Sequence, residues 1–470
     1  MSDAAEGTVL GRDTNGPATS SRRRRIDRWG IAFIVASVVA FVALLYLGRS
    51  VTFYHDDWTF IDTRLGWSID TFMRPHNEHW VLVPALLWKS LLATVGFQSY
   101  LPYLAINFAA HVATAAAIYW GVRRIAGPAA GLVLGVLMLS LGSGAELFFH
   151  AAGANLVMAT AAGAWALMIT IATDRPRPLL VAVLLLVGVA SGGPGLFFVA
   201  AVAVYLLFVP GRWRQGWVVM PALGSYVVWL TVYGRENTEV AWKPTLGALV
   251  ELWDFVRVGA TGAVAGVTAL GSEIGMIVLA ILVLATGWQL LGRGPYLYAA
   301  LAALAGLAAQ NIVTGLVRVG EAGSPPDAPR YVYTGAVFVM VALAAWYGSR
   351  PRMRPINALP LLAIAAWAIV FNLFQVRWWA DDWYTVRSQE TRAAIEVALE
   401  YGGTELLPGD QRPLHPSDPF LRALPSADRL REIIDTLPGT PLDDAWQPGS
   451  YAVPAEIRER IESEILDVHR

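Results

Sequence analysis

The residues best suited to do chemistry begin with an acidic pair that directly follows the first apolar stretch of the chain. Asp56 and Asp57 are adjacent in the segment Phe53-Tyr54-His55-Asp56-Asp57-Trp58. Two neighbouring carboxylates repel each other and lose hydration at a membrane surface, so we expect the pKa of at least one to rise. Such a carboxylate suits a general base that deprotonates a hydroxyl group, with Asp57 slightly favoured over Asp56. A solvated turn or a helix N-cap is the alternative interpretation.

A second polar segment follows within the same loop and places two imidazoles and a carboxylate within four residues. These are His76, Glu78 and His79, which come shortly after Arg74. The set could hold a divalent metal, act as an acid and base pair, recognise phosphate or simply cap the structure. As a zinc site it is nonstandard, because the His-Glu-x-x-His spacing is absent and a further ligand would have to come from elsewhere. We expect these residues, with Arg74, to form a polar wall; no cofactor is required, and a divalent metal is left open.

Two later segments add candidate binding groups. Glu146 and His150 are four residues apart, which would place them on one face if their loop is helical. The alternative is an interfacial pair that bonds lipid headgroups. Arg330-Tyr331 enters a late apolar stretch. A guanidinium at that edge is well shaped for a lipid phosphate, although snorkelling to headgroups would explain a lone arginine equally well.

The composition shows what kind of elements must position these residues. Of 470 residues, 56% are apolar and only 15% are charged, so lipid must form part of the solvent of the chain. Lys and Arg number 35 against 36 Asp and Glu, so no overall charge favours nucleic acid. Cysteine is absent, which excludes disulfides, thiolate metal sites and cysteine nucleophiles.

An all-α polytopic membrane fold with about eleven transmembrane helices is predicted, because roughly 20 apolar residues span a bilayer. Residues 178–209 are divided at Ser191-Gly192-Gly193-Pro194-Gly195, since one helix of that length would exceed a bilayer core. The predicted spans are 30–47, 100–121, 128–143, 153–173, 178–191, 193–209, 217–233, 275–292, 296–317, 332–348 and 357–374.

Arginine placement predicts the orientation, because positive charge is retained on the cytoplasmic side of short loops. Every loop assigned inside is basic. Residues 1–29 form a disordered, basic cytoplasmic tail, and residues 30–374 form the transmembrane domain, with a long first extracytoplasmic loop at 50–99 that includes an interfacial apolar segment. Residues 375–470 form a small extracytoplasmic region with helices near 388–401, 426–437 and 454–468. The segment 234–274 is expected to be an outer loop.

Together, the acidic pair after the first span, the long first outer loop and the Arg-Tyr entering a late span resemble the GT-C superfamily of membrane glycosyltransferases. The pattern looks most like the protein-mannosyltransferase-like and aminoarabinose-transferase-like branch, although Asn77-Glu78-His79-Trp80 follows His76 where a proline is more usual. The resemblance implies that Asp56 or Asp57 is the catalytic base and that Arg330 contacts a donor lipid phosphate. It also implies a polyprenyl-phosphate sugar as donor and inversion at the anomeric carbon.

We therefore expect a glycosyltransferase of the cell membrane that moves a sugar to an acceptor at the outer face. The expected partners are the bilayer, the lipid-linked sugar donor and a glycan, lipid or protein acceptor, without nucleic acid. The substrate-binding candidates are Arg330, Tyr331, His76, Glu78, His79, Arg74, Glu146 and His150. A transporter or flippase would share the many spans, but it would keep its binding groups near the midplane. A noncatalytic cell-envelope scaffold is the other alternative.

Overall fold

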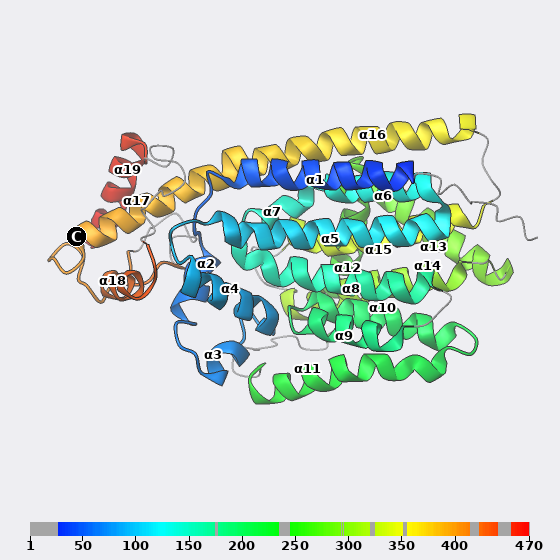
Figure 1. The fold of residues 1–470 in the computed structure, drawn as a ribbon, viewed down its shortest axis with the longest axis horizontal. Coiled ribbons are helices and arrows are strands. Elements are labelled where there is room, and N and C mark those ends of the chain that lie inside the picture. The colour runs from blue at the N-terminus through cyan, green and yellow to red at the C-terminus, as the bar shows by residue number, and fades with distance from the viewer. Residues whose placement is uncertain are drawn as a thin grey trace, which may run out of the picture.

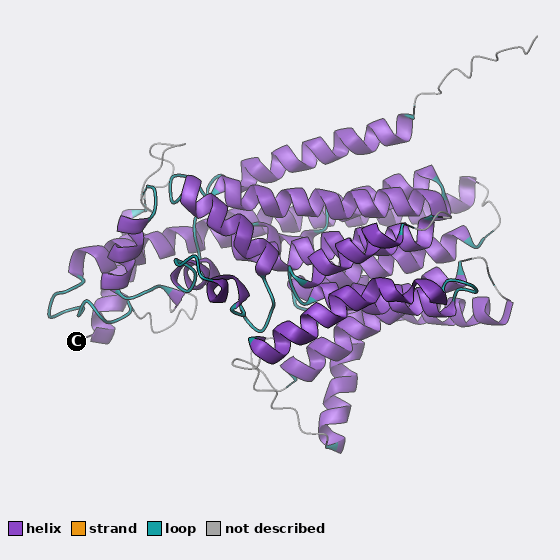
Figure 2. Cartoon of the chain, turned by 60° about the horizontal axis from the view of Figure 1, so that its bottom comes forward, coloured by secondary structure: helices purple, strands orange, loops and turns teal. Residues whose placement is uncertain are grey.

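The computed structural model describes residues 27–173, 177–234, 245–292, 294, 296–319, 325–350, 355–413, 423–439 and 453–469. The predicted tail 1–29 lies almost entirely outside the described residues. Where it is described, the chain is helical, apart from short turns and two isolated bridges (Figure 2). The predicted all-α class is therefore confirmed.

Long helices form a bundle in which each of the eleven predicted spans coincides with one helix (Figure 1). Loops of few residues connect most of them, so that consecutive helices are antiparallel neighbours. These helices are α1 (Arg28–Gly48), α5 (Leu101–Ala126), α6 (Pro128–Leu139), α8 (Ala154–Ala172), α9 (Pro178–Val189), α10 (Pro194–Phe208), α11 (Met220–Val232), α13 (Gly271–Gly292), α14 (Leu297–Arg318), α15 (Pro329–Gly348) and α16 (Pro355–Trp378).

The outer surface of the bundle is apolar, as contact with lipid requires. Large hydrophobic side chains are exposed along α1, α11, α13 and α16, and no water-soluble protein could leave so many of them uncovered. Among the described residues, eight helical runs are long and apolar enough to cross a membrane, and α6 with the bent segment after it makes a ninth. The chain is thus a polytopic membrane protein, while the count of eleven stays a prediction because α9 and α10 are short.

The segment that the sequence assigned to an outer loop, 234–274, contains the additional helix α12 (Leu246–Thr268). Its first half carries Glu251, Asp254 and Arg257, which hid it from a search for apolar spans. Its second half is rich in small residues and packs against α13, α14 and α15. A Cβ atom added at Gly262 would stand 2.7 Å from the Cβ of Asp327, so the absent side chain lets α12 hold the entrance to α15 in place.

One end of the bundle carries all the short helices that surround the candidate residues (Figure 1). From the first loop come α2 (Asp56–Asp62), α3 (Ile69–Met73) and α4 (Leu82–Thr94). From the last part of the chain come α17 (Thr385–Tyr401), α18 (Ala427–Thr436) and α19 (Ala455–His469), close to the predicted helices. Arg429 Nε donates to Asp62 Oδ1 at 2.7 Å, which joins the two regions.

No loop separates the last predicted span from the predicted C-terminal region. A six-residue π-helix, η5 (Trp379–Tyr384), continues α16 directly into α17, so that the helical run extends to Tyr401. The expected boundary at residues 374 and 375 falls inside this run.

Candidate functional site

The acidic pair begins α2, and its two carboxylates face different surroundings. Asp57 is fully buried, together with Trp58 and Ile61 of the same helix. Its Oδ2 accepts from the Tyr100 hydroxyl at 2.5 Å and from the Tyr54 N–H at 3.1 Å. Its Oδ1 accepts from the Ala152 N–H at 2.8 Å. Asp57 therefore joins the first loop, the start of α5 and the segment between α7 (Ala145–Phe148) and α8.

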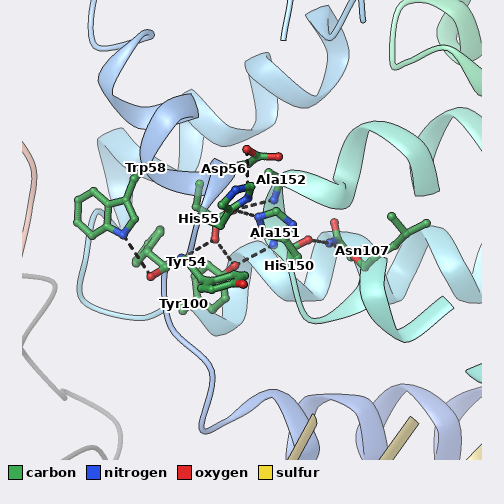
Figure 3. A network of polar contacts seen from close by, with 12 residues as sticks. Tyr54, His55, Asp56, Trp58, Tyr100, Asn107, His150, Ala151 and Ala152 are labelled. Atoms are coloured by element: carbon green, nitrogen blue, oxygen red, sulfur yellow. Dashed lines mark hydrogen bonds and ion pairs between the residues drawn. The ribbon is translucent and has the colours of Figure 1, made fainter. Parts of the chain in front are cut away.

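Tyr100 makes a further hydrogen bond to the same segment between α7 and α8. Its oxygen accepts from the Ala151 N–H at 2.8 Å (Figure 3), while its hydroxyl donates to Asp57. His150 Nε2 lies 3.5 Å from Asp57 Oδ1. Burial raises the pKa of Asp57 above its ordinary value, and the positive charge that His150 can carry and the three hydrogen bonds oppose that rise without cancelling it.

Asp56 is directed away from Tyr100 and lines a cavity (Figure 3). It accepts from Asn77 Nδ2 at 3.1 Å and lies 3.2 Å from His55 Nδ1. Burial acts to raise its pKa, but the combined effect of His55, His150, His76 and the Asn77 hydrogen bond is larger, and the pKa is lowered from 3.8. Asp56 is therefore ionised at neutral pH and has an accessible carboxylate.

The polar segment after α3 forms a tight turn rather than a helix. His76 and His79 exchange backbone hydrogen bonds of 3.1 and 3.0 Å, and the two residues between them, Asn77 and Glu78, have φ angles of 45° and 63°. Asparagine tolerates this left-handed conformation, whereas for glutamate it is strained. The turn places His76, Asn77, Glu78 and His79 on the cavity.

Two arginines of the cavity are each paired with a glutamate from a distant part of the chain. Arg318, at the end of α14, donates to Glu78 at 2.6 Å. Arg330, in the first turn of α15, donates to Glu146 at 2.8 Å, and its backbone N–H donates to the other oxygen of the same carboxylate at 2.9 Å. Each guanidinium is thus held at a fixed place on the wall.

These residues enclose a polar cavity of about 390 Å³ at the end of the bundle. Its walls come from the first loop, the segment around α7, the two arginines and η5. A second cavity of about 140 Å³ adjoins it between α10, α11, α14 and α15, and most of its lining is apolar. Both cavities share six lining residues, Glu78, His79, Leu156, Arg318, Arg330 and Tyr331. The two arginines therefore stand where the polar cavity meets the apolar one.

Most of the residues predicted from the sequence meet in the polar cavity. Asp56, His76, Glu78, His79, Glu146, His150, Arg330 and Tyr331 all line it. Arg74 does not line it; its side chain is exposed, and its carbonyl accepts from Arg64 at 2.8 Å. Asp57, the slightly favoured base, does not line it either, since its carboxylate is enclosed by the hydrogen bonds described above.

The predicted reason for pairing Glu146 with His150 is wrong, although both residues line the cavity. α7 ends at Phe148, and His150 has an extended backbone with φ −120° and ψ 111°. The two side chains therefore do not share a helical face. Glu146 pairs with Arg330, while His150 approaches Asp57.

The two histidines among the predicted metal candidates pack against different neighbours. His76 lies edge-on to the Phe60 ring, whereas His79 packs against Gly193 of the turn before α10. Among the residues that the structure describes, no three His, Asp or Glu side chains are placed to hold one metal ion. Burial lowers the pKa of His76 to about 3, and burial with the charge of Arg318 lowers that of His79 to about 4. Both imidazoles are therefore neutral at physiological pH.

The wall that η5 forms was not predicted from the sequence. Trp379, Trp383 and Tyr384 line the polar cavity, and Tyr384 donates to the backbone carbonyl of Glu146 at 2.6 Å. A signal was present, because Asp-Asp-Trp occurs at 56–58 and again at 381–383, each time after the outer end of a predicted span. The two copies present different residues to the cavity. The first copy presents the carboxylate of Asp56, and the second presents the indole of Trp383.

Comparisons with known proteins give matches in structure alone. No protein family and no curated protein matches the sequence. The structure is similar to ArnT from Cupriavidus metallidurans bound to undecaprenyl phosphate, with 16% identity, a TM-score of 0.48 and coverage of 87% of this chain and 88% of that one. For ArnT from the same organism in the apo state, the identity is 14% and the TM-score is 0.47, and the match covers 81% of this chain and 81% of that one.

A third match is the Archaeoglobus fulgidus oligosaccharyltransferase in complex with Zn and sulfate. The identity is 13%, the TM-score is 0.36, and the match covers 78% of this chain and 55% of that one. The likeness to all three structures concerns the fold alone, at identities of 13 to 16%.

Proposed function

We propose that this protein transfers a sugar from a polyprenyl-phosphate donor to a hydroxyl group of an acceptor. The observation that carries the proposal is the arrangement of the two cavities. An ionised carboxylate, Asp56, lines the polar cavity, and two arginines stand at its junction with the apolar cavity. The parts of a lipid-linked sugar follow the same order. Its polar sugar corresponds to the polar cavity, its anionic phosphate to the arginines and its apolar chain to the apolar cavity.

The donor would place its phosphate at Arg330 and Arg318. Guanidinium groups remain charged and can bind phosphate oxygens in pairs. Glu78 and Glu146 hold both groups in position, and either carboxylate can share its arginine with an incoming phosphate or yield it. The first isoprene units would lie along the apolar cavity beside Leu156. Burying these units in place of water would contribute to affinity.

The reaction needs one base and one stabilised leaving group. Asp56 takes the proton of the acceptor hydroxyl as that oxygen attacks the anomeric carbon. The bond between the anomeric carbon and the phosphate oxygen breaks, and its electron pair leaves with the polyprenyl phosphate, whose charge Arg330 and Arg318 stabilise. Attack from the side opposite the phosphate inverts the anomeric configuration.

His76, His79 and Asp57 support this chemistry without carrying charge changes of their own. The two imidazoles are neutral and can orient sugar hydroxyls or the phosphate as hydrogen-bond donors and acceptors. Asp57 is a positioning residue, because it fixes the segment on which His150 and Ala152 reach the cavity. No step requires a metal ion.

The proposed site faces the extracytoplasmic side of the cell membrane, with the N-terminus in the cytoplasm and the C-terminal region outside. The last turn of α5, which carries Arg123 and Arg124, and the segment 212–214 after α10 belong to the bundle end away from α2 and α17, which fits retention of positive charge inside. A transporter would instead keep its polar groups near the midplane of the membrane.

Binding of the lipid alone tests the donor assignment. The purified full chain is titrated with undecaprenyl phosphate in mixed micelles, and the thermal unfolding midpoint is followed with and without chelator. We expect a rise with the wild type that chelator does not change, and a much smaller rise with Arg330→Gln or Arg318→Gln. Arg257→Gln, on the exposed face of α12, serves as the matched control. Equal rises for the wild type and both cavity variants would rule out this phosphate site.

A further inference from the structure

The wall formed by η5 has features that the transfer reaction described above does not use. η5 is a π-helix, a rare form that often occurs at functional sites. Its wide turn brings Trp379 and Trp383 to the polar cavity with their ring centres 5.6 Å apart. Of the described residues that line the apolar cavity, none belongs to η5. The two indoles therefore belong to the part of the site away from the proposed lipid chain.

Contacts with neighbouring elements hold this wall in a fixed shape. Tyr384 is buried and is anchored on the Glu146 carbonyl, and the Thr385 hydroxyl donates to the Ala380 carbonyl at 2.8 Å across the wide turn. The Arg387 guanidinium lies 5.1 Å from the centre of the Trp383 ring. The indoles are thus preorganised, which reduces the entropy lost when a ligand binds.

Membrane-interface tryptophans are the ordinary explanation for indoles at the end of a span. Trp288 on α13 fits that explanation, because it is 77% exposed on the lipid-facing surface and lines neither cavity. Trp379 and Trp383 differ from it, since both are half-buried and face a polar cavity that contains Asp56. An aromatic surface beside hydrogen-bonding groups fits a ligand that is apolar on one face and polar at its edge.

We propose that Trp379 and Trp383 form a stacking subsite for a carbohydrate acceptor, so that the acceptor is a glycan. The C–H groups on one face of a pyranose carry partial positive charge and are attracted to the negative face of an indole. The hydroxyl groups at the ring edge then reach Asp56 and its polar neighbours. An alkyl chain would leave those polar groups unpaired, at a cost in free energy. This inference rests on the proposed function and names its acceptor class.

Binding of neutral oligosaccharides to the full chain in detergent tests the subsite. Saturation-transfer NMR is run with mannotriose, cellotriose and galactotriose against the wild type, Trp379→Ala, Trp383→Ala and Trp288→Ala. At least one trisaccharide should bind the wild type and Trp288→Ala, with its axial C–H protons most strongly saturated. Each cavity variant should bind it about tenfold more weakly or worse, the size of effect that loss of an aromatic stacking face has elsewhere.

Trp383→Phe and Trp379→Phe are made beside the alanine variants, because they keep a stacking face and most of the side-chain volume. They should retain most of the binding, and thermal midpoints verify that every variant is folded. Failure of all three trisaccharides to bind the wild type would overturn the subsite, as would unchanged binding in both alanine variants.

Undecaprenyl phosphate binding is measured on the same preparations to separate this inference from the proposed function. It should be unchanged by the tryptophan substitutions. Trisaccharide binding that depends on Trp379 and Trp383, in a chain that does not bind the lipid, would overturn the donor assignment and support the carbohydrate subsite. Lipid binding without trisaccharide binding would support the donor assignment and overturn the carbohydrate subsite.

Discussion

At the scale of single residues, the two members of the acidic pair differ in their surroundings. Asp57 holds buried parts of the structure together, and Asp56 lines the cavity. Successive positions on a helix point about 100° apart, so one carboxylate of α2 enters the core while the other faces the cavity. The sequence predicted the pair and a raised pKa for one member. It could not tell which member is buried, because that depends on Tyr100 and Ala152, which are 43 and 95 residues away. The geometry favours Asp56 as the base.

Replacing Asp57 should mainly destabilise the protein. Asp57→Asn removes the charge that accepts three hydrogen bonds in a fully buried position and turns an amide N–H₂ toward donors. We expect the free energy of unfolding to fall by about 2 to 3 kcal/mol. The thermal midpoint in detergent measures the effect, with Asp56→Asn as the matched variant. A larger loss of stability in Asp56→Asn than in Asp57→Asn would contradict these assignments.

The pH dependence of kcat should show which carboxylate acts. Transfer requires an ionised base, so the rate falls as pH drops through the pKa of that base. The pKa of Asp56 lies below 3.8, and the pKa values of His76 and His79 are about 3 and 4. The rate should therefore be nearly flat from about pH 7 to about pH 5. An acid limb near pH 6 would point instead to a base with a raised pKa, such as Asp57.

At the scale of elements, the turn from His76 to His79 depends on a buried cation behind it. Arg64 is almost fully buried and donates to the carbonyls of Arg74 and Pro75 at 2.8 and 3.2 Å. Burial lowers its pKa to about 10, so the guanidinium stays charged at neutral pH. The sequence grouped the residues of this turn correctly. It did not predict their left-handed backbone, because Asn-Glu lacks the glycine that usually marks such a turn.

Arg64→Met should loosen this turn without substituting any residue that lines the cavity. The backbone amides of His76 and His79 should exchange hydrogen faster, because the carbonyls that precede the turn lose their donor. Hydrogen exchange followed by mass spectrometry measures this, and Arg377→Met, at an exposed position on α16, is the control. Unchanged exchange over residues 74–79 in Arg64→Met would show that the cation does not support the turn.

Two other elements, α12 and η5, were not predicted from the sequence. The pattern of apolar residues located the long helices, because lipid requires about 20 apolar residues at each crossing. It missed α12, whose helix is stabilised by packing of small residues against α15 rather than by an apolar run. It also missed η5, whose contacts with α1 and α7 join parts of the chain that are far apart in the sequence.

At the scale of the whole molecule, the first loop and the C-terminal region meet at one end of the bundle (Figure 1). The arginine pattern placed both on the same side of the membrane. It could not predict their contact, which includes the Arg429–Asp62 pair and a 2.7 Å hydrogen bond from the Phe97 N–H to the Pro438 carbonyl. The C-terminal region thus supports the loop that carries Asp56.

Accessibility labelling tests the orientation, and the absence of native cysteine makes the experiment direct. Single cysteines are introduced at the exposed positions Ile69, Glu405 and Arg214. A maleimide that cannot cross membranes should label Ile69→Cys and Glu405→Cys in intact cells, and Arg214→Cys only after permeabilisation. Labelling of Ile69→Cys and Glu405→Cys from opposite sides would contradict the shared outer face.

We propose above all that Asp56 acts as the base at a cavity that receives a lipid-linked sugar. This role is tested most directly by the release of undecaprenyl phosphate from a panel of radiolabelled undecaprenyl-phosphate sugars by the purified full chain, with mannotriose, cellotriose and galactotriose supplied as acceptors. We expect release with the wild type and a decrease of about 10² to 10⁴-fold in Asp56→Asn, with lipid binding retained. Release by Asp56→Asn at the wild-type rate, or no release by the folded wild type with any sugar of the panel, would contradict the claim.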